Sequence, residues 1–147
     1  MELTVLSLRV PRESENTPEQ TAQLLASLAK ATAKQVHISL EVTLEASQIT
    51  FAAVFPRNLK TFVSSQLLAT YPDVVITEIK DYLKSWNQKL SLATVKQQYA
   101  AYFPLRDYAD YKEVDPMLPL LGVLSKANPQ DRILIQFDVH PHAQLQF

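Results

Sequence analysis

The alternation of polar and apolar residues between positions 37 and 55 constrains the fold of this chain more than any other feature. From 37 to 45, and again from 49 to 55, apolar side chains occupy every second position. This period of two predicts a pair of strands with one face buried and the other in water. The residues expected on the buried face are Ile38, Leu40, Val42, Leu44, Ile49, Phe51, Ala53 and Phe55. The residues expected in water are Ser39, Glu41, Thr43 and Glu45.

The residues around this hairpin predict an α+β unit. Residues 3 to 10 are apolar on nearly both faces, which is typical of a strand in the interior of a sheet. A capping box at residues 17 to 20 begins a helix, Asn58 is expected to cap a second helix, and residues 74 to 82 predict a further strand. The resulting order over residues 1–83 predicts a ferredoxin-like βαββαβ sandwich with its first and third strands in the centre. Its core is expected to depend on Phe51, Phe55, Phe62 and Leu67.

The rest of the chain predicts a linker at 84–94 and a partial second β-α-β repeat over residues 95–147. This repeat comprises a strand at 95–105, a helix at 116–127 and a strand at 132–140. The residues of the last strand expected to face inward are Ile133, Ile135, Phe137 and Val139.

The second repeat lacks the hairpin that would complete it, and an uncovered sheet edge exposes backbone groups that folded proteins pair or cover. Three arrangements are open: the two strands pair directly, the first sheet accepts them, or a second copy of the chain completes the structure. We expect a homodimer or a partner-completed sheet involving residues 132–140.

Composition excludes several classes of site. The 147 residues include no cysteine, so disulfides, thiolate metal ligands and thiol nucleophiles are excluded. The single glycine, Gly122, lies in a helical pattern, which excludes a glycine-rich phosphate loop and hence a nucleotide motor within this chain. A formal net charge of −1 demands neither nucleic acid nor an anionic membrane as partner. No apolar run is long enough to span a bilayer, and the first ten residues predict a strand rather than a secretory signal.

The candidate chemical sites have simpler structural explanations. His37, His140 and His142 would form a metal site only if the fold brought them together, and a polar strand end explains the last two better. The acidic loop 107–115 lacks the ligand spacing of a calcium loop and is expected to cap the next helix. No serine or threonine has an evident base, so we expect no catalytic residue, metal or cofactor, and hence no enzyme.

The region around Trp86 has two interpretations. Lys84 and Lys89 flank this indole, and a basic aromatic stretch can contact nucleic acid or a membrane surface. One aromatic residue with scattered lysines makes no stacking platform, so an indole that packs on its own domain is favoured. Nucleic-acid binding is therefore expected to be weak at best. Candidate interaction residues are Trp86, Lys84, Lys89, Ile133, Ile135 and Phe137.

Several segments together resemble an uncharacterised domain that precedes conjugative coupling-protein ATPases, the TraG and HerA-like DNA-transfer motors of candidate-phyla bacteria. The segments that carry the resemblance are residues 8–13 (LRVPRE), 49–56, 62–66 (FVSSQ), Thr70-Tyr71-Pro72, Asp81-Tyr82, Tyr102-Phe103-Pro104-Leu105, Asp115-Pro116 and Ile135-Gln136. These motifs are prolines, caps and core positions, and they cover nearly the whole chain.

The resemblance implies a non-catalytic interaction module that helps to assemble a type IV secretion or conjugation-like ATPase. Its expected partner is the ATPase module or a second copy of the chain. Its expected location is the cytoplasm, with membrane association through a partner. A small nucleic-acid-binding module is the alternative function, since ferredoxin-like sheets can present aromatics to single strands. The acidic outward set of the second strand, without aromatics, argues against that alternative.

Overall fold

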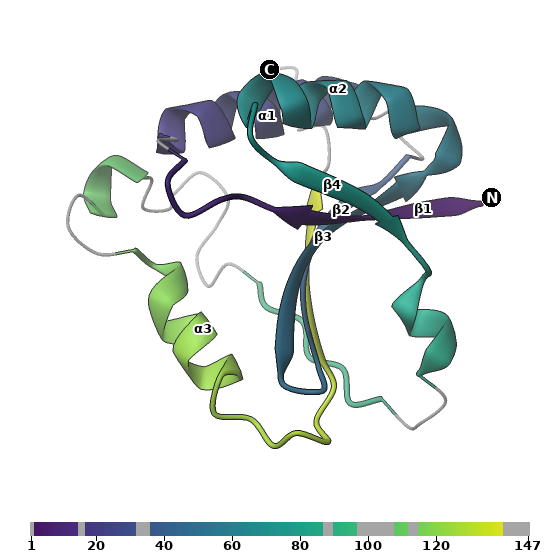
Figure 1. The fold of residues 1–147 in the computed structure, drawn as a ribbon, viewed down its shortest axis with the longest axis vertical. Coiled ribbons are helices and arrows are strands. Elements are labelled where there is room, and N and C mark those ends of the chain that lie inside the picture. Colours follow the sequence, from purple (N-terminus) through teal and green to yellow (C-terminus); the bar gives the residue numbers. More distant parts are fainter. Residues whose placement is uncertain are drawn as a thin grey trace, which may run out of the picture.

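A computed structural model describes residues 2–14, 17–31, 36–86, 90–96, 108–111 and 115–139. These residues form an α+β fold with a five-stranded antiparallel sheet and three α-helices (Figure 1). The strands are β1 (Leu3–Arg9), β2 (Ile38–Glu45), β3 (Gln48–Pro56), β4 (Val75–Ile79) and β5 (Ile133–Val139). The α-helices are α1 (Pro18–Ala31), α2 (Lys60–Thr70) and α3 (Met117–Leu124), and the 3-10 turns are η1 (Arg57–Leu59), η2 (Tyr82–Ser85) and η3 (Tyr108–Tyr111).

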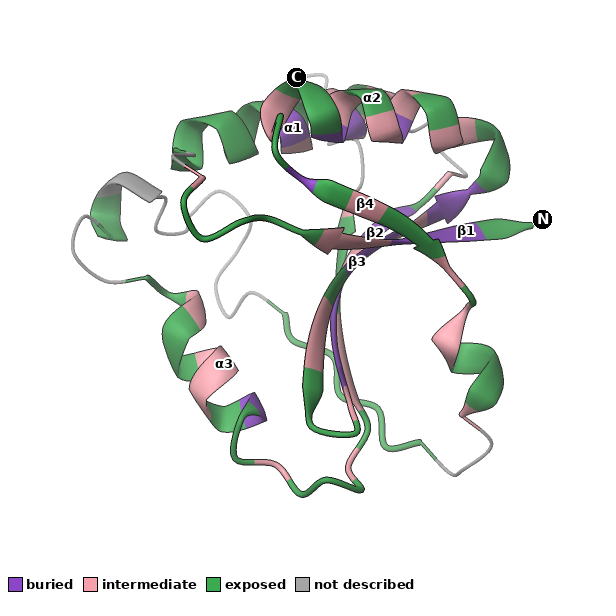
Figure 2. Cartoon of the chain, viewed as in Figure 1, coloured by how far each residue is buried: buried purple, intermediate pink, exposed green. Residues whose placement is uncertain are grey.

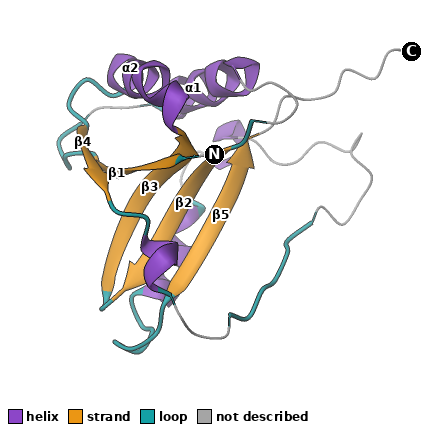
Figure 3. Ribbon diagram, turned by 90° about the vertical axis from the view of Figure 1, so that its right-hand side faces the viewer, coloured by secondary structure: helices purple, strands orange, loops and turns teal. Residues whose placement is uncertain are grey.

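The strand order of the sheet is β4-β1-β3-β2-β5 (Figure 3). The apolar first strand therefore has neighbours on both sides, as its sequence predicts. β5 pairs antiparallel with β2, with Ile135 opposite Val42 and Phe137 opposite Leu40. The last strand thus joins the sheet of the first four. The strand predicted from Val95 does not begin there, because residues 95 and 96 have no regular structure, and positions 97–105 lie outside the described residues.

All three α-helices are associated with one face of the sheet, in two groups (Figures 1 and 2). The first cluster lies under α1 and α2, and its buried members are Leu6, Leu24, Leu28, Ile38, Ala53, Phe55, Val63 and Leu67. The second cluster lies against α3, and its buried members are Val42, Leu44 and Leu124. Phe55 and Leu67 are core residues as predicted, and Phe62 packs partly buried against the first cluster. The assignment of Phe51 to the core is wrong, since its side chain is 43% exposed and belongs to neither cluster.

Half of the capping box predicted for α1 is confirmed, namely the contact by which Gln20 reaches back to Thr17. The backbone N–H of Thr17 donates to Oε1 of Gln20 at 2.9 Å, which satisfies one donor at the helix start. The predicted Asn58 cap of α2 is wrong, because the chain passes from Pro56 through η1 and no side chain caps α2.

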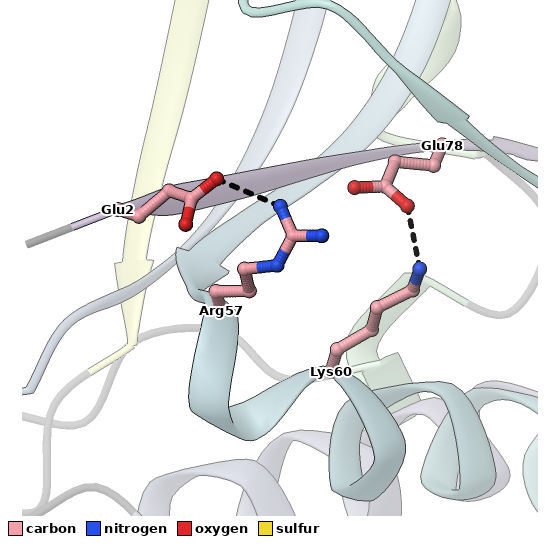
Figure 4. A network of polar contacts seen from close by, with 4 residues as sticks. All are labelled: Glu2, Arg57, Lys60 and Glu78. Atoms are coloured by element: carbon pink, nitrogen blue, oxygen red, sulfur yellow. Dashed lines mark hydrogen bonds and ion pairs between the residues drawn. The ribbon is translucent and has the colours of Figure 1, made fainter.

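The start of α2 is held to the sheet by ion pairs instead (Figure 4). Arg57 Nη1 lies 2.7 Å from Glu2 Oε1, and Lys60 Nζ lies 2.5 Å from Glu78 Oε2. The Lys60 ammonium lowers the pKa of the Glu78 carboxyl, chiefly through their hydrogen bond. All four side chains are substantially exposed, so these pairs position the helix more than they stabilise the fold.

The β2–β3 hairpin turns through Ala46 and Ser47, between the paired residues Glu45 and Gln48. Their φ angles are 48° and 63°, so both lie in the left-handed region, as in a type I′ turn. Such turns favour glycine, asparagine and aspartate, and neither alanine nor serine has that preference. The two turn residues do not favour this conformation, so the register of the hairpin is maintained by the packing of its strand side chains.

Candidate interaction surface

The second face of the sheet is covered over β2, which corrects the expectation that its polar residues lie in water. Ser39 and Thr43 are buried, and Glu41 is only 3% exposed. Tyr82, in η2, and Gln136, on β5, both contact Glu41. Alternation along a strand cannot reveal this cover, because the covering residues come from distant segments.

Glu41 is a buried carboxylate held by neutral donors. The Tyr82 hydroxyl donates to Oε2, and Nε2 of Gln136 donates to Oε1 at 2.8 Å. Burial, followed by the hydrogen bond to Glu41, raises the pKa of Tyr82 well above its usual range. The phenol therefore remains a neutral donor across the physiological range. This link joins β2, η2 and β5 and has a structural rather than a catalytic geometry.

Trp86 follows η2 and packs on the domain, in agreement with the favoured structural interpretation. Its ring centroid lies 6.3 Å from that of Tyr82, with the planes tilted by 42°. It lines an open hollow of about 420 Å³ with Thr43, Glu45, Thr50 and Lys80 among its walls. Glu45 Oε1 also lies 3.1 Å from Nε of Arg132, at the start of β5.

Of the two lysines predicted to flank this indole, only Lys84 lies among the described residues. Lys84 is exposed on η2, whereas Lys89 lies outside the described residues. The only described partner of the Trp86 ring is Tyr82. The described part of the chain therefore offers no row of stacked aromatics.

β5 forms one edge of the sheet among the described strands (Figure 3). The predicted inward residues of this strand divide between the two clusters: Ile133 and Ile135 pack against the second, and Val139 packs against the first. Phe137 lies between them, belongs to neither cluster and is 47% exposed. The predicted interaction residues of this strand thus converge on an edge where one aromatic ring is left half covered.

α3 adds apolar surface beside this edge. Its eight residues carry no charge, and Leu124 is its buried residue, whereas Leu118 and Val123 are largely exposed. A helix that is apolar on all sides normally lies in a core. Its exposed side is therefore a candidate contact surface.

The segment from residue 90 to 96 carries exposed apolar residues that sequence analysis did not identify. Leu92 is 92% exposed and Val95 is 97% exposed, and Leu90 is also well exposed. The segment has no regular structure, although it contains the β-prone run Leu-Ala-Thr-Val. The alternation of Leu90 and Leu92 with Ser91 was a signal for an extended apolar segment. It was overlooked because it is short and lies within the predicted linker.

Among the described residues, no group of three potential metal ligands is close enough to hold an ion. His37 precedes β2, and His140 and His142 lie outside the described residues. In the acidic loop, Asp115 Oδ1 accepts from the backbone N–H of Met117 at 2.8 Å, which makes it a cap for α3. None of the described helices combines the length and apolar character required to cross a bilayer.

Comparisons of the chain with protein-family models, with curated proteins and with solved structures found no match.

Proposed function

We propose that this protein is a non-catalytic assembly module that binds a protein partner through the β5 edge and the adjacent exposed side of α3. The observation that carries this proposal is the half-exposed Phe137 on an edge strand, beside an uncharged helix with Leu118 and Val123 in solvent. Edge strands bind extended segments through backbone hydrogen bonds, and neighbouring apolar side chains supply the specificity.

The partner we favour is a type IV secretion or conjugation-like DNA-transfer ATPase. Its support is the resemblance carried by residues 8–13, 62–66 and 115–116. A second copy of the chain is the other candidate partner, in which case residues 132–140 would complete a homodimer. Such a module would work in the cytoplasm and reach the membrane through its partner.

The ferredoxin-like assignment of residues 1–83 is part of the same proposal. Its support is the order β4-β1-β3-β2 within the sheet, with α1 and α2 together on one face. In this reading β5 is an added strand on the β2 edge, and α3 covers the part of the sheet that the first unit leaves open.

The nucleic-acid alternative is disfavoured by the arrangement of the second sheet face. A surface that binds single-stranded nucleic acid requires accessible aromatic side chains and positive charge. Ser39, Glu41 and Thr43 are instead buried in the region contacted by Tyr82, and the only ionisable residue among these three is acidic.

The test is calorimetric titration of the purified protein with a purified ATPase of the type IV secretion or conjugation class. We expect saturable binding that is lost when Phe137→Asp places a charge on the edge. Val75→Asp is the matched control, because Val75 is similarly exposed but lies on β4, at the opposite edge. Equal binding by both variants, or no binding by the unmodified protein, would refute the proposal.

A further inference from the structure

The segment 90–96 runs beyond the outer side of the β5 edge (Figure 3), and both the segment and the edge leave groups uncovered. β5 is an edge among the described strands, so its outer backbone groups have no strand partner there. The segment exposes Leu90, Leu92 and Val95 and has no regular structure. An unpaired edge and an extended apolar segment are the two components of β-strand addition.

We infer that residues 90–96 dock along the outer edge of β5 of the same chain as a sixth strand, parallel to β5. The docked strand would occupy the edge to which we assign partner binding, so an incoming partner would displace it. The regulatory part of this inference rests on the proposed function, whereas the docking itself does not.

The chain that leads into the segment places it near the start of β5. The Ser85 carbonyl accepts from Nη1 of Arg132 at 3.4 Å, and Arg132 immediately precedes β5. Residues 86 and 90 are separated by four peptide links, which reach about 13 Å when extended. The adjacent edge position is therefore within reach, one strand spacing of about 4.8 Å beyond β5.

The direction of the chain favours parallel pairing. The segment starts near the beginning of β5 and, in Figure 3, is the teal trace that runs beyond the outer side of β5 in the direction of that strand. Adjacent parallel strands require a crossover of a dozen or more residues, usually including a helix. Residues 97–132 supply this length, and α3 within them packs on the sheet.

The side chains of the docked strand would complete the surface that β5 leaves open. Side chains alternate between faces, so Leu90 and Leu92 can lie on the face of Phe137 while Ser91 and Ala93 lie on the face of Gln136. Leu92 would then cover part of the exposed Phe137 ring.

The absence of cysteine allows a direct test with introduced pairs. The double variant Ala93→Cys with Gln136→Cys is treated with a short bismaleimide, after circular dichroism has verified the fold. The control pair is Ala93→Cys with Thr77→Cys, because Thr77 lies in the same cross-strand row and on the same face as Gln136 but at the β4 edge. Four strand spacings, about 19 Å, separate the two edges.

We expect intramolecular crosslinking to be about tenfold faster in the first pair than in the control, because docking raises the effective concentration of the two thiols. Adding Leu92→Asp should remove this advantage, whereas Ser91→Asp adds the same charge on the other face and should preserve it. Hydrogen exchange at residues 90–96 provides a second measurement, with protection expected in the unmodified chain and lost with Leu92→Asp.

Equal rates for the two pairs, or no effect of Leu92→Asp on rate and protection, would overturn the docking. A product crosslinked between two chains would also overturn it and would assign the segment to the edge of a second copy. Both measurements use the isolated chain, so failure to bind a motor ATPase leaves their outcome unchanged.

Discussion

The two ends of the helix-covered sheet face are packed to different degrees. Under α1 and α2, the described residues form a cluster with eight buried members drawn from five elements. Under α3, the corresponding cluster has three buried members, and the helix exposes apolar side chains on its outer side. Phe51 and Phe137 lie outside both clusters. The comparison indicates that residues up to 83 supply most of their own cover, whereas the C-terminal part leaves apolar surface for contacts elsewhere.

The largest expected effect lies in the first cluster. Phe55→Ala removes a side chain that is 1% exposed and leaves a cavity among well-packed neighbours. We expect a loss of about 3–5 kcal/mol in the free energy of unfolding, measured by urea titration. A loss below about 1 kcal/mol would show that this end is not the tightly packed one.

The second cluster should be less sensitive. Leu124→Ala deletes its buried helix residue, but the smaller cluster can relax around the site. We expect a loss of about 2 kcal/mol, near the lower limit for buried leucines. Amide exchange in α3 should also be faster than in α1 and α2. Exchange rates that are equal in all three helices would remove the contrast between the two ends.

Tyr82→Phe tests the link between β2, η2 and β5 on the opposite face. The change leaves Glu41 with the Gln136 amide as its remaining described donor, so we expect a loss of about 1–2 kcal/mol at neutral pH. The pKa of Tyr82 is raised by folding, so the native state retains a proton that the unfolded chain releases above about pH 10.

Stability attributable to Tyr82 should therefore be complete at neutral pH and decline as the pH rises above about 10. The Tyr82→Phe variant should show a shallower decline in the same range, measured by thermal melts from neutral to alkaline pH. Identical alkaline slopes for both proteins would contradict the assigned hydrogen bond.

The smallest effect is expected at the partly exposed edge. Phe137→Ser should change the free energy of unfolding by less than about 0.5–1 kcal/mol, because the ring already contacts water and belongs to neither cluster. Chemical denaturation is the measurement. A loss as large as that of Leu124→Ala would mean that Phe137 is a core residue rather than a contact surface.

Hydrophobic periodicity was sufficient to predict the elements of residues 1–83 and the presence of α3 and β5. It failed where burial depends on segments far apart in sequence. Glu41 occupies an alternating polar position that is typical of exposed residues, but it is buried because Tyr82 and Gln136, 41 and 95 residues away, supply its donors. Phe51 shows the opposite error. It was assigned to the correct face of its strand, but it is exposed because it lies between the two helix groups.

The proposed interaction surface was predictable only in part. The sequence identified β5 and its apolar residues, and the structure places Phe137 among them at a half-covered position. The exposure of Leu92 and Val95 was not predicted, because a short apolar run is equally typical of a strand and of a linker. Which residues remain uncovered is a property of the packed chain rather than of any local pattern.

The hairpin turn has a consequence for the order of folding events. Because Ala46 and Ser47 adopt positive φ without the residues that favour it, the isolated β2–β3 hairpin should rarely close by itself. We therefore expect its strands to pair late, after contacts with α1 and α2 have formed. Ser47→Gly should therefore slow unfolding more than it accelerates refolding, which would place the turn outside the folding nucleus. The chain would assemble around its helices, with the hairpin tip among the last regions to order.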